Sequence, residues 1–216
     1  MEASAGFNQF FDEANATKSS RYGFGVDWQV TPDLAIGGEM TWRDIEEPFI
    51  DALQNRVVDV DTKEQLHQAY VYWTPFDELA VRAGFAYDKF DRESEDFLAR
   101  VISQDPLKVE TISVPVNLSY FHPSGFFAMA GATFVDQDVD RLSGFENQGH
   151  DNFFVVDLGI GYRFPDRIGI ASLQVQNLLD EGMEYQDDSY REFQEEPSVG
   201  PYFPDRTILG RVVLNF

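Results

Sequence analysis

Three aspartates that alternate along one short segment are the residues of this sequence whose spacing could bind a metal ion. Asp136, Asp138 and Asp140 are separated by Gln137 and Val139. Alternate carboxylates can offer oxygen ligands to Ca²⁺, but the glycine and the twelfth-position glutamate of an EF-hand loop are missing. We therefore treat these aspartates as a candidate divalent-ion loop and expect no other cofactor.

The other residue types that serve in catalysis are scattered. His67, His122 and His150 fall on an expected strand, a tight turn and a long loop, which is too dispersed for a zinc triad. The glycine pairs inside the strands are not followed by a helix, as a phosphate-binding turn requires, and no Ser/His/Asp arrangement stands out. The sequence predicts a protein that is not an enzyme.

Acidic residues dominate the charge of the chain. Lys and Arg number 16 against 38 Asp and Glu, which gives a formal net charge of -22. This balance argues against a nucleic-acid partner. The acids gather in two expected loops, residues 44–63 and 180–205. A solvated acidic surface, a divalent-ion bridge to lipopolysaccharide and a funnel for a cationic substrate are the alternatives for these loops. With no cysteine, the chain has neither disulfides nor thiolate metal ligands.

A repeated turn signal organises the chain. Four segments place an aromatic residue shortly before proline and a turn former after it, with the prolines at nearly even intervals: Pro32, Pro75, Pro123 and Pro165. Proline followed by Asp or Ser-Gly favours a tight turn, and apolar alternation on both sides favours a hairpin. Each proline therefore marks a predicted hairpin tip.

The alternation predicts about ten strands. Two lie near the C-terminus, and the others are expected at residues 6–12, 21–30, 34–43, 66–73, 79–88, 112–120, 126–135 and 154–164. The remaining connections, at 13–19, 45–63, 91–107, 136–150 and 180–204, are long. Short turns therefore alternate with long loops along the chain, which is the layout of an outer-membrane β-barrel. There is no apolar run long enough for a transmembrane helix and no N-terminal signal peptide.

We therefore expect an all-β fold, an antiparallel up-and-down transmembrane β-barrel that closes alone or forms the C-terminal part of a larger barrel. We expect residues 1–216 to form a single barrel domain, or the C-terminal segment of a barrel, without a plug domain. The charged residues on the polar face of the strands are expected to face the lumen: Arg21, Asp27, Glu39, Arg43, Arg82, Asp88, Asp157, Arg163 and Arg211. Aromatic residues at strand ends are expected at the membrane interfaces: Trp28, Trp42, Tyr72, Trp73, Tyr120 and Tyr162.

Two segments near the C-terminus resemble the last strands of TonB-dependent outer-membrane receptors. The first ends on Asn177-Leu178-Leu179-Asp180, with Leu179 in place of the usual aromatic residue, and the second begins at Pro204-Asp205-Arg206. The resemblance implies a barrel that takes up a scarce nutrient, with a plug domain or a TonB system supplied by a longer chain. It also implies that assembly machinery reads the terminal strand, through the residues Val212, Leu214 and Phe216.

The expected function is passage of a solute across the bacterial outer membrane. The expected partners are outer-membrane lipid, lipopolysaccharide and the barrel assembly machinery. A passive pore or an export barrel of a larger envelope protein is one alternative. A soluble β-barrel that binds a partner would also alternate, and it is the alternative outside the membrane.

Overall fold

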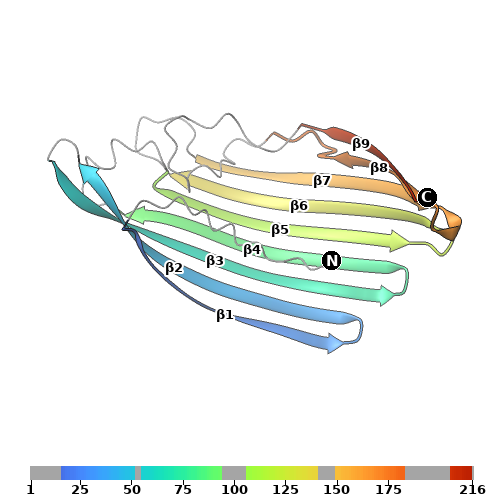
Figure 1. Ribbon diagram of the computed structural model, residues 1–216, viewed down its shortest axis with the longest axis horizontal. Helices are drawn as coiled ribbons and strands as arrows, with labels where there is room; N and C mark the ends of the chain where they lie inside the picture. Colours follow the sequence, from blue (N-terminus) through green and yellow to red (C-terminus); the bar gives the residue numbers. More distant parts are fainter. Residues whose placement is uncertain (1–15, 52–54, 94–105, 141–148, 183–204, 216) are drawn as a thin grey trace.

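The computed structural model describes residues 16–51, 55–93, 106–140, 149–182 and 205–215, and they form one antiparallel sheet of nine strands. Each strand pairs with the next one along the chain, so the sheet order is β1 to β9 (Figure 1). The strands are β1 (Lys18–Thr31), β2 (Leu34–Asp51), β3 (Arg56–Phe76), β4 (Leu79–Glu93), β5 (Lys108–Phe121), β6 (Phe126–Asp140), β7 (Gly149–Arg163), β8 (Gly169–Gln176) and β9 (Thr207–Leu214).

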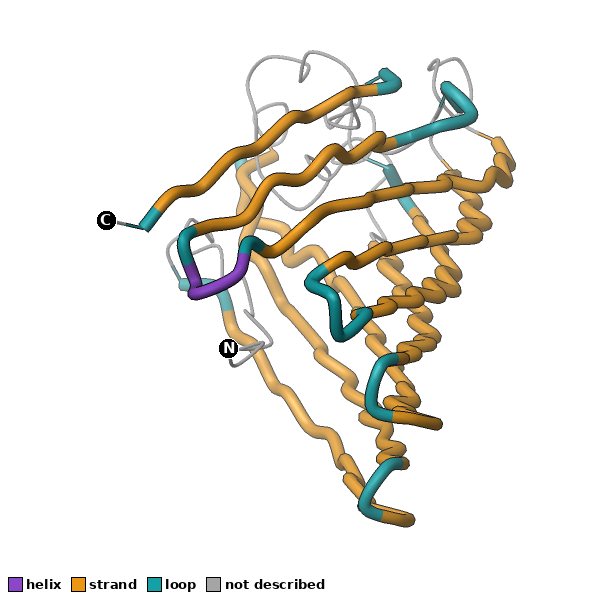
Figure 2. Tube along the Cα trace, turned by 90° about the vertical axis from the view of Figure 1, so that its right-hand side faces the viewer, coloured by secondary structure: helices purple, strands orange, loops and turns teal. Residues whose placement is uncertain are grey.

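The all-β, antiparallel, up-and-down prediction is confirmed. The described strands do not close into a barrel, because β1 and β9 are not hydrogen-bonded to each other and lie at opposite margins of the sheet (Figures 1 and 2). The strand expected at residues 6–12 lies outside the described residues. Within the described ranges, no helix is long and apolar enough to cross a membrane.

Tight connections join the strands at one end of the sheet, called the hairpin end below. Pro32 and Asp33 connect β1 to β2. Between β5 and β6, Gly125, at φ 96°, donates its N–H to the backbone carbonyl oxygen of His122 at 2.9 Å. A short 3-10 helix, η1 (Pro165–Arg167), connects β7 to β8. Pro75 differs from its prediction, because it lies inside β3 at a register shift before the turn. Proline has no N–H to give to a ladder, so a bulge accommodates it.

Several predicted long connections are instead paired strand. β2 and β3 stay in register from Leu34 opposite Trp73 to Asp51 opposite Arg56, so most of residues 45–63 is ladder. β6 likewise continues to Asp140. Both faces of these extensions carry polar residues, so the alternation that identifies a strand disappears while the backbone pairing continues.

The two faces of the sheet differ in exposure. On one face the apolar side chains are open, with Val26 65% and Val212 68% exposed. Six apolar residues are buried among those described, all on the other face. Five lie toward the end of the sheet opposite the hairpins, Phe90, Val109, Val135, Val139 and Phe153, and Phe127 lies beside the turn between β5 and β6. Because the sheet is curved (Figure 2), this asymmetry is expected if the buried side chains line the inside of the curve, where they converge.

Candidate functional site

An uninterrupted apolar belt crosses one face of the sheet. The register brings alternate residues of all nine strands to this face, and within the belt none of them is Asp, Glu, Lys or Arg. The only titratable side chain other than tyrosine is His67. The belt comprises residues 22–30 of β1, 34–42 of β2, 67–73 of β3, 79–87 of β4, 112–120 of β5, 126–134 of β6, 154–162 of β7, 169–175 of β8 and 208–214 of β9.

The dimensions of the belt are those of a membrane-spanning sheet. On six of the strands it is about nine residues long, close to the 9–11 residues that a tilted strand needs to cross a bilayer. At about 3.3 Å per residue this is about 26 Å along the strand. On β3, β8 and β9 the belt is shorter, about seven residues.

The belt also drifts across the hydrogen-bonded rows, most of all between β7 and β8. One row of cross-strand partners runs from Ile208 of β9 to Leu34 of β2. At its edge away from the hairpins, the belt begins at Ile208 on β9 but at Trp42 on β2. The drift is about one residue for each strand step. With strands about 4.8 Å apart, it corresponds to a strand tilt of roughly 35° if the belt is level, within the range of β-barrels.

Aromatic rings follow both edges of the belt. Tyr22 stacks on Trp42 with ring centroids 5.7 Å apart, and the row continues through His67 to Tyr87. At the hairpin end, the belt face carries Trp28, Trp73, Tyr120 and Tyr162. Five of the six aromatic residues predicted for the interfaces are therefore on the belt face.

Tyr72 is the exception among the predicted interface aromatics. It pairs with Arg82 on the opposite face, where the guanidinium lies 5.4 Å from the ring centroid. Phe153 is also on that face and is buried, whereas its neighbour Phe154 belongs to the belt. In each case two aromatic residues are adjacent in sequence, and only the register distinguishes which of them points to the belt.

The face opposite the belt is the polar face. It carries all nine charged residues that were predicted to face a lumen: Arg21, Asp27, Glu39, Arg43, Arg82, Asp88, Asp157, Arg163 and Arg211. Arg43 donates Nε–H to the Ser19 hydroxyl at 2.9 Å and lies 3.5 Å from Glu64. The structure therefore groups these residues on one side without gathering them into a single pocket.

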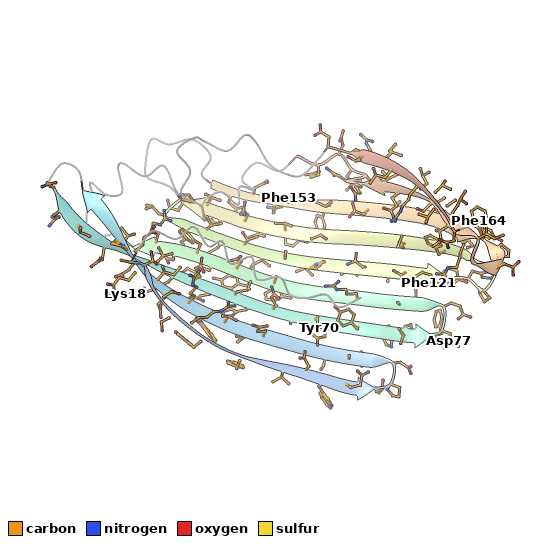
Figure 3. The ribbon with its side chains drawn as sticks, viewed as in Figure 1. Lys18, Tyr70, Asp77, Phe121, Phe153 and Phe164 are labelled. Atoms are coloured by element: carbon orange, nitrogen blue, oxygen red, sulfur yellow. The ribbon has the colours of Figure 1, made fainter. Side chains whose placement is uncertain are left out.

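Tyr70 is a residue of the polar face that the sequence did not single out. Its hydroxyl donates a hydrogen bond to the Asp27 carboxylate. The ring crosses Gly37 of the intervening strand, where a Cβ atom would lie only 2.5 Å from the Tyr70 hydroxyl. The bare glycine backbone thus leaves room for a contact that joins β3 to β1. Figure 3 shows Tyr70 on its strand, with Lys18 near the end of the sheet opposite the hairpins and Asp77 and Phe121 at the hairpin end.

A ladder of opposite charges lies just beyond the edge of the belt that is away from the hairpin end, called the loop side below. One cross-strand row on the belt face reads Asp44, Lys63, Asp91, Lys108 and Asp140. Lys89 Nζ lies 3.0 Å from Asp91 and 3.6 Å from Glu110, and Lys108 Nζ lies 3.1 Å from Glu110. At the margin, Lys18 is 2.6 Å from Glu46, and this hydrogen bond raises the pKa of Lys18.

The candidate divalent-ion residues differ from their prediction. Asp136, Asp138 and Asp140 are not in a loop but in β6, at successive positions of the belt face. Such positions are about 6.6 Å apart, too far for three single carboxylates to share one ion in an extended strand. Asp136 Oδ2 instead lies 3.5 Å from His150 Nε2. Within the residues that the structure describes, no group of three metal-binding side chains is assembled; calcium binding stays a prediction.

The two C-terminal motifs meet at the base of the long connection between β8 and β9. Asp180 accepts the Arg206 backbone N–H and its guanidinium, each at 2.9 Å. These two bonds hold the pKa of Asp180 below its usual value. Asn177, at φ 48°, is buried; its N–H donates to Asp157 at 2.9 Å, and its side-chain amide exchanges two hydrogen bonds with the Glu181 backbone.

Of the predicted assembly residues, Val212 and Leu214 are on the belt face of β9, and Phe216 lies outside the described residues. His122 contacts Ser124 in the tight turn, with Nδ1 and Oγ 2.8 Å apart. The predicted residues therefore lie on two faces and at two ends of one sheet.

Comparison with protein-family models, with curated proteins and with solved structures found no match.

Proposed function

We propose that this chain is part of a bacterial outer-membrane β-barrel in which the apolar belt contacts lipid and the polar face lines the lumen. The observation that carries the proposal is the belt itself: uncharged, about nine residues long on most strands, and tilted by about one residue per strand. In water this apolar surface would be exposed to solvent. Exposed apolar patches of this extent mark an interaction surface.

The edges of the belt support the same proposal. Trp and Tyr rings favour the two membrane interfaces, and here they border the belt at both ends. Charged residues appear on the belt face only beyond the aromatic row. This sequence of zones, from charged to aromatic to apolar to aromatic, is the one that a bilayer selects.

We infer that strands other than those described complete the barrel, because lipid does not tolerate unpaired strand edges and, among the described strands, β1 and β9 each have an edge without a partner. The resemblance to the C-terminal strands of TonB-dependent receptors gives the proposal its activity, the passage of a solute through the lumen. The arginines and carboxylates of the polar face would then set the polarity of the pathway.

Mobility in gels tests the proposal first. The chain, extracted into detergent, should migrate differently before and after boiling, as folded membrane barrels do. The second readout is quenching of tryptophan by lipids brominated on their acyl chains. Trp28, Trp42 and Trp73 all lie at belt edges, so lipids brominated near the headgroup should quench more than lipids brominated near the chain ends. Solubility in plain buffer, with no mobility shift and no quenching, would contradict the proposal.

A further inference from the structure

Lysine and arginine occupy opposite faces of the sheet. The chain has four lysines, and all lie on the belt face just beyond its loop side: Lys18, Lys63, Lys89 and Lys108. The arginines of the nine strands all lie on the polar face: Arg21, Arg43, Arg56, Arg82, Arg92, Arg163 and Arg211. Either residue would neutralise a carboxylate, so charge balance alone does not explain this separation.

Three of the lysines form a compact group on adjacent strands, called the lysine cluster below. Lys63 of β3 and Lys108 of β5 are both opposite Asp91 of β4, and Lys89 is the next belt-face position on β4. The three positions lie within about 10 Å of one another, given the spacing of strands. Each is one or two belt-face positions beyond the last belt residue of its strand, which is about 7–13 Å along the strand.

The lysine cluster is the positively charged sector of the charged ladder. Asp91 and Glu110 lie among the three lysines, at 3.0 to 3.6 Å from the ammonium groups of Lys89 and Lys108, and Asp44 and Asp140 flank the cluster on the same row. Neighbouring β6 presents three aspartates on the same face and no lysine. In a chain of net charge -22, three lysines on adjacent strands of one face are a matter of placement rather than of composition.

The chemistry of lysine suits a ligand that lies just beyond the edge of the belt. Its alkyl stem can lie on apolar surface while the ammonium group reaches the water, and that group is a compact charge with three donors. A phosphate at the membrane surface matches such donors, and lysine binds phosphate as a compact point charge. Gln65 and the Tyr87 hydroxyl lie beside the cluster and add hydrogen-bonding groups.

We propose that the lysine cluster binds the phosphate headgroup of a lipid whose acyl chains lie against the belt on β3 to β5. This inference rests on the proposed contact of the belt with lipid. The lipid would occupy a fixed place on the barrel wall, with its phosphate near Lys63, Lys89 and Lys108 and its chains over Val71, Phe85 and Val116.

A single tryptophan can report this lipid locally. Trp42 pairs with Gln65, one belt-face position from Lys63, so Trp28→Phe and Trp73→Phe leave one fluorophore beside the cluster. The full chain is folded into phosphatidylcholine vesicles that contain a minor fraction of either brominated phosphatidic acid or brominated phosphatidylcholine. At equal mole fraction, phosphatidic acid should quench Trp42 more strongly, by an amount that corresponds to at least tenfold preferential binding.

Substitutions assign the preference to the cluster. Lys63→Gln, Lys89→Gln and Lys108→Gln together should remove it, and the corresponding arginine variants should restore it. Lys18→Gln, on the margin of the same face, and Arg82→Gln, on the polar face, are matched controls that should leave it intact. If the triple variant loses its heat-dependent mobility, the three single glutamine variants carry the test, and each should reduce the preference.

The outcomes separate the two proposals. Equal quenching by both lipids in the parent chain would overturn the lipid site and leave the membrane contact standing, whereas quenching by neither lipid would refute the membrane contact itself. Inorganic phosphate, added at constant ionic strength, should not abolish the preference. If it does, the cluster binds free phosphate and the lipid assignment is wrong.

Discussion

Replacing Gly161 with alanine should destabilise the sheet through two identifiable contacts. Gly161 lies on the polar face of β7, and the Phe127 ring of β6 packs against its bare backbone. A Cβ atom at this position would lie 2.7 Å from Phe127 Cε1 and 2.7 Å from the Ala171 carbonyl oxygen. Phe127 is buried and the carbonyl oxygen belongs to the neighbouring strand, so neither can move away freely.

The expected magnitude follows from two opposing effects. Forcing a methyl group into packed surroundings costs about 1–3 kcal/mol. Alanine gains roughly 0.5–1 kcal/mol over glycine within a strand, because the unfolded chain loses less freedom. The free energy of unfolding should therefore fall by about 1–2 kcal/mol. Gly210→Ala is the matched control, since a Cβ atom there meets nothing within 4 Å, and it should be neutral or slightly stabilising.

The assay is urea unfolding of the chain in lipid vesicles, followed by tryptophan fluorescence. Phe127→Ala alone should cost about 3 kcal/mol. In the double variant the alanine methyl no longer meets the ring but still meets the Ala171 carbonyl oxygen, so the combined loss should be smaller than the sum of the single losses by about 1 kcal/mol. Additive losses, or a Gly161→Ala protein as stable as the parent chain, would refute the packing argument.

Three further predictions concern other parts of the sheet. Gly37→Ala should displace the Tyr70 ring that crosses this glycine and lower the urea midpoint, whereas Tyr70→Phe, which removes only the hydroxyl, should lower it less. Leu118→Arg places a charge within the belt and should cost about 2–4 kcal/mol in vesicles, while Ser119→Arg, on the polar face, should change stability little; equal costs would contradict the assignment of faces. Because the pKa of Asp180 is lowered in the folded chain, its stabilising contribution should be complete above about pH 4 and fade as the pH falls through the folded pKa. Asp180→Asn should be less stable than the parent chain near neutral pH and should lack this component of the acid dependence in pH-resolved unfolding curves.

The strands that cross the belt could be predicted from the sequence because the two environments of their faces differ. Tyr22, Phe24, Val26 and Trp28 alternate with small or polar residues, and the register confirms that division. Beyond the belt both faces mix polar and apolar residues. The period of two therefore vanishes at residues 45–63, and paired strand was predicted as loop.

Contacts between strands depend on register, which a single chain pattern does not give. Tyr72 and Trp73 are adjacent aromatics, and only the pairing with β4 assigns Tyr72 to the polar face. Likewise, the placement of the Tyr70 ring over Gly37 depends on the alignment of two strands. The separation of lysine from arginine could not be predicted, because Lys18, Lys63, Lys89 and Lys108 all lie outside the strands that the alternation identifies, and only the extended pairing assigns them a face.

The most direct test of the lipid-facing belt is a spin-label scan along β5. The chain contains no cysteine, so single cysteines introduced at residues 112–120 can be labelled without background. In vesicles, labels at even positions should be accessible to oxygen, which concentrates in lipid, and labels at odd positions should be accessible to a water-soluble nickel chelate. The account predicts this alternation along the full length of the segment. Equal access of the nickel chelate to both sets of positions would contradict it.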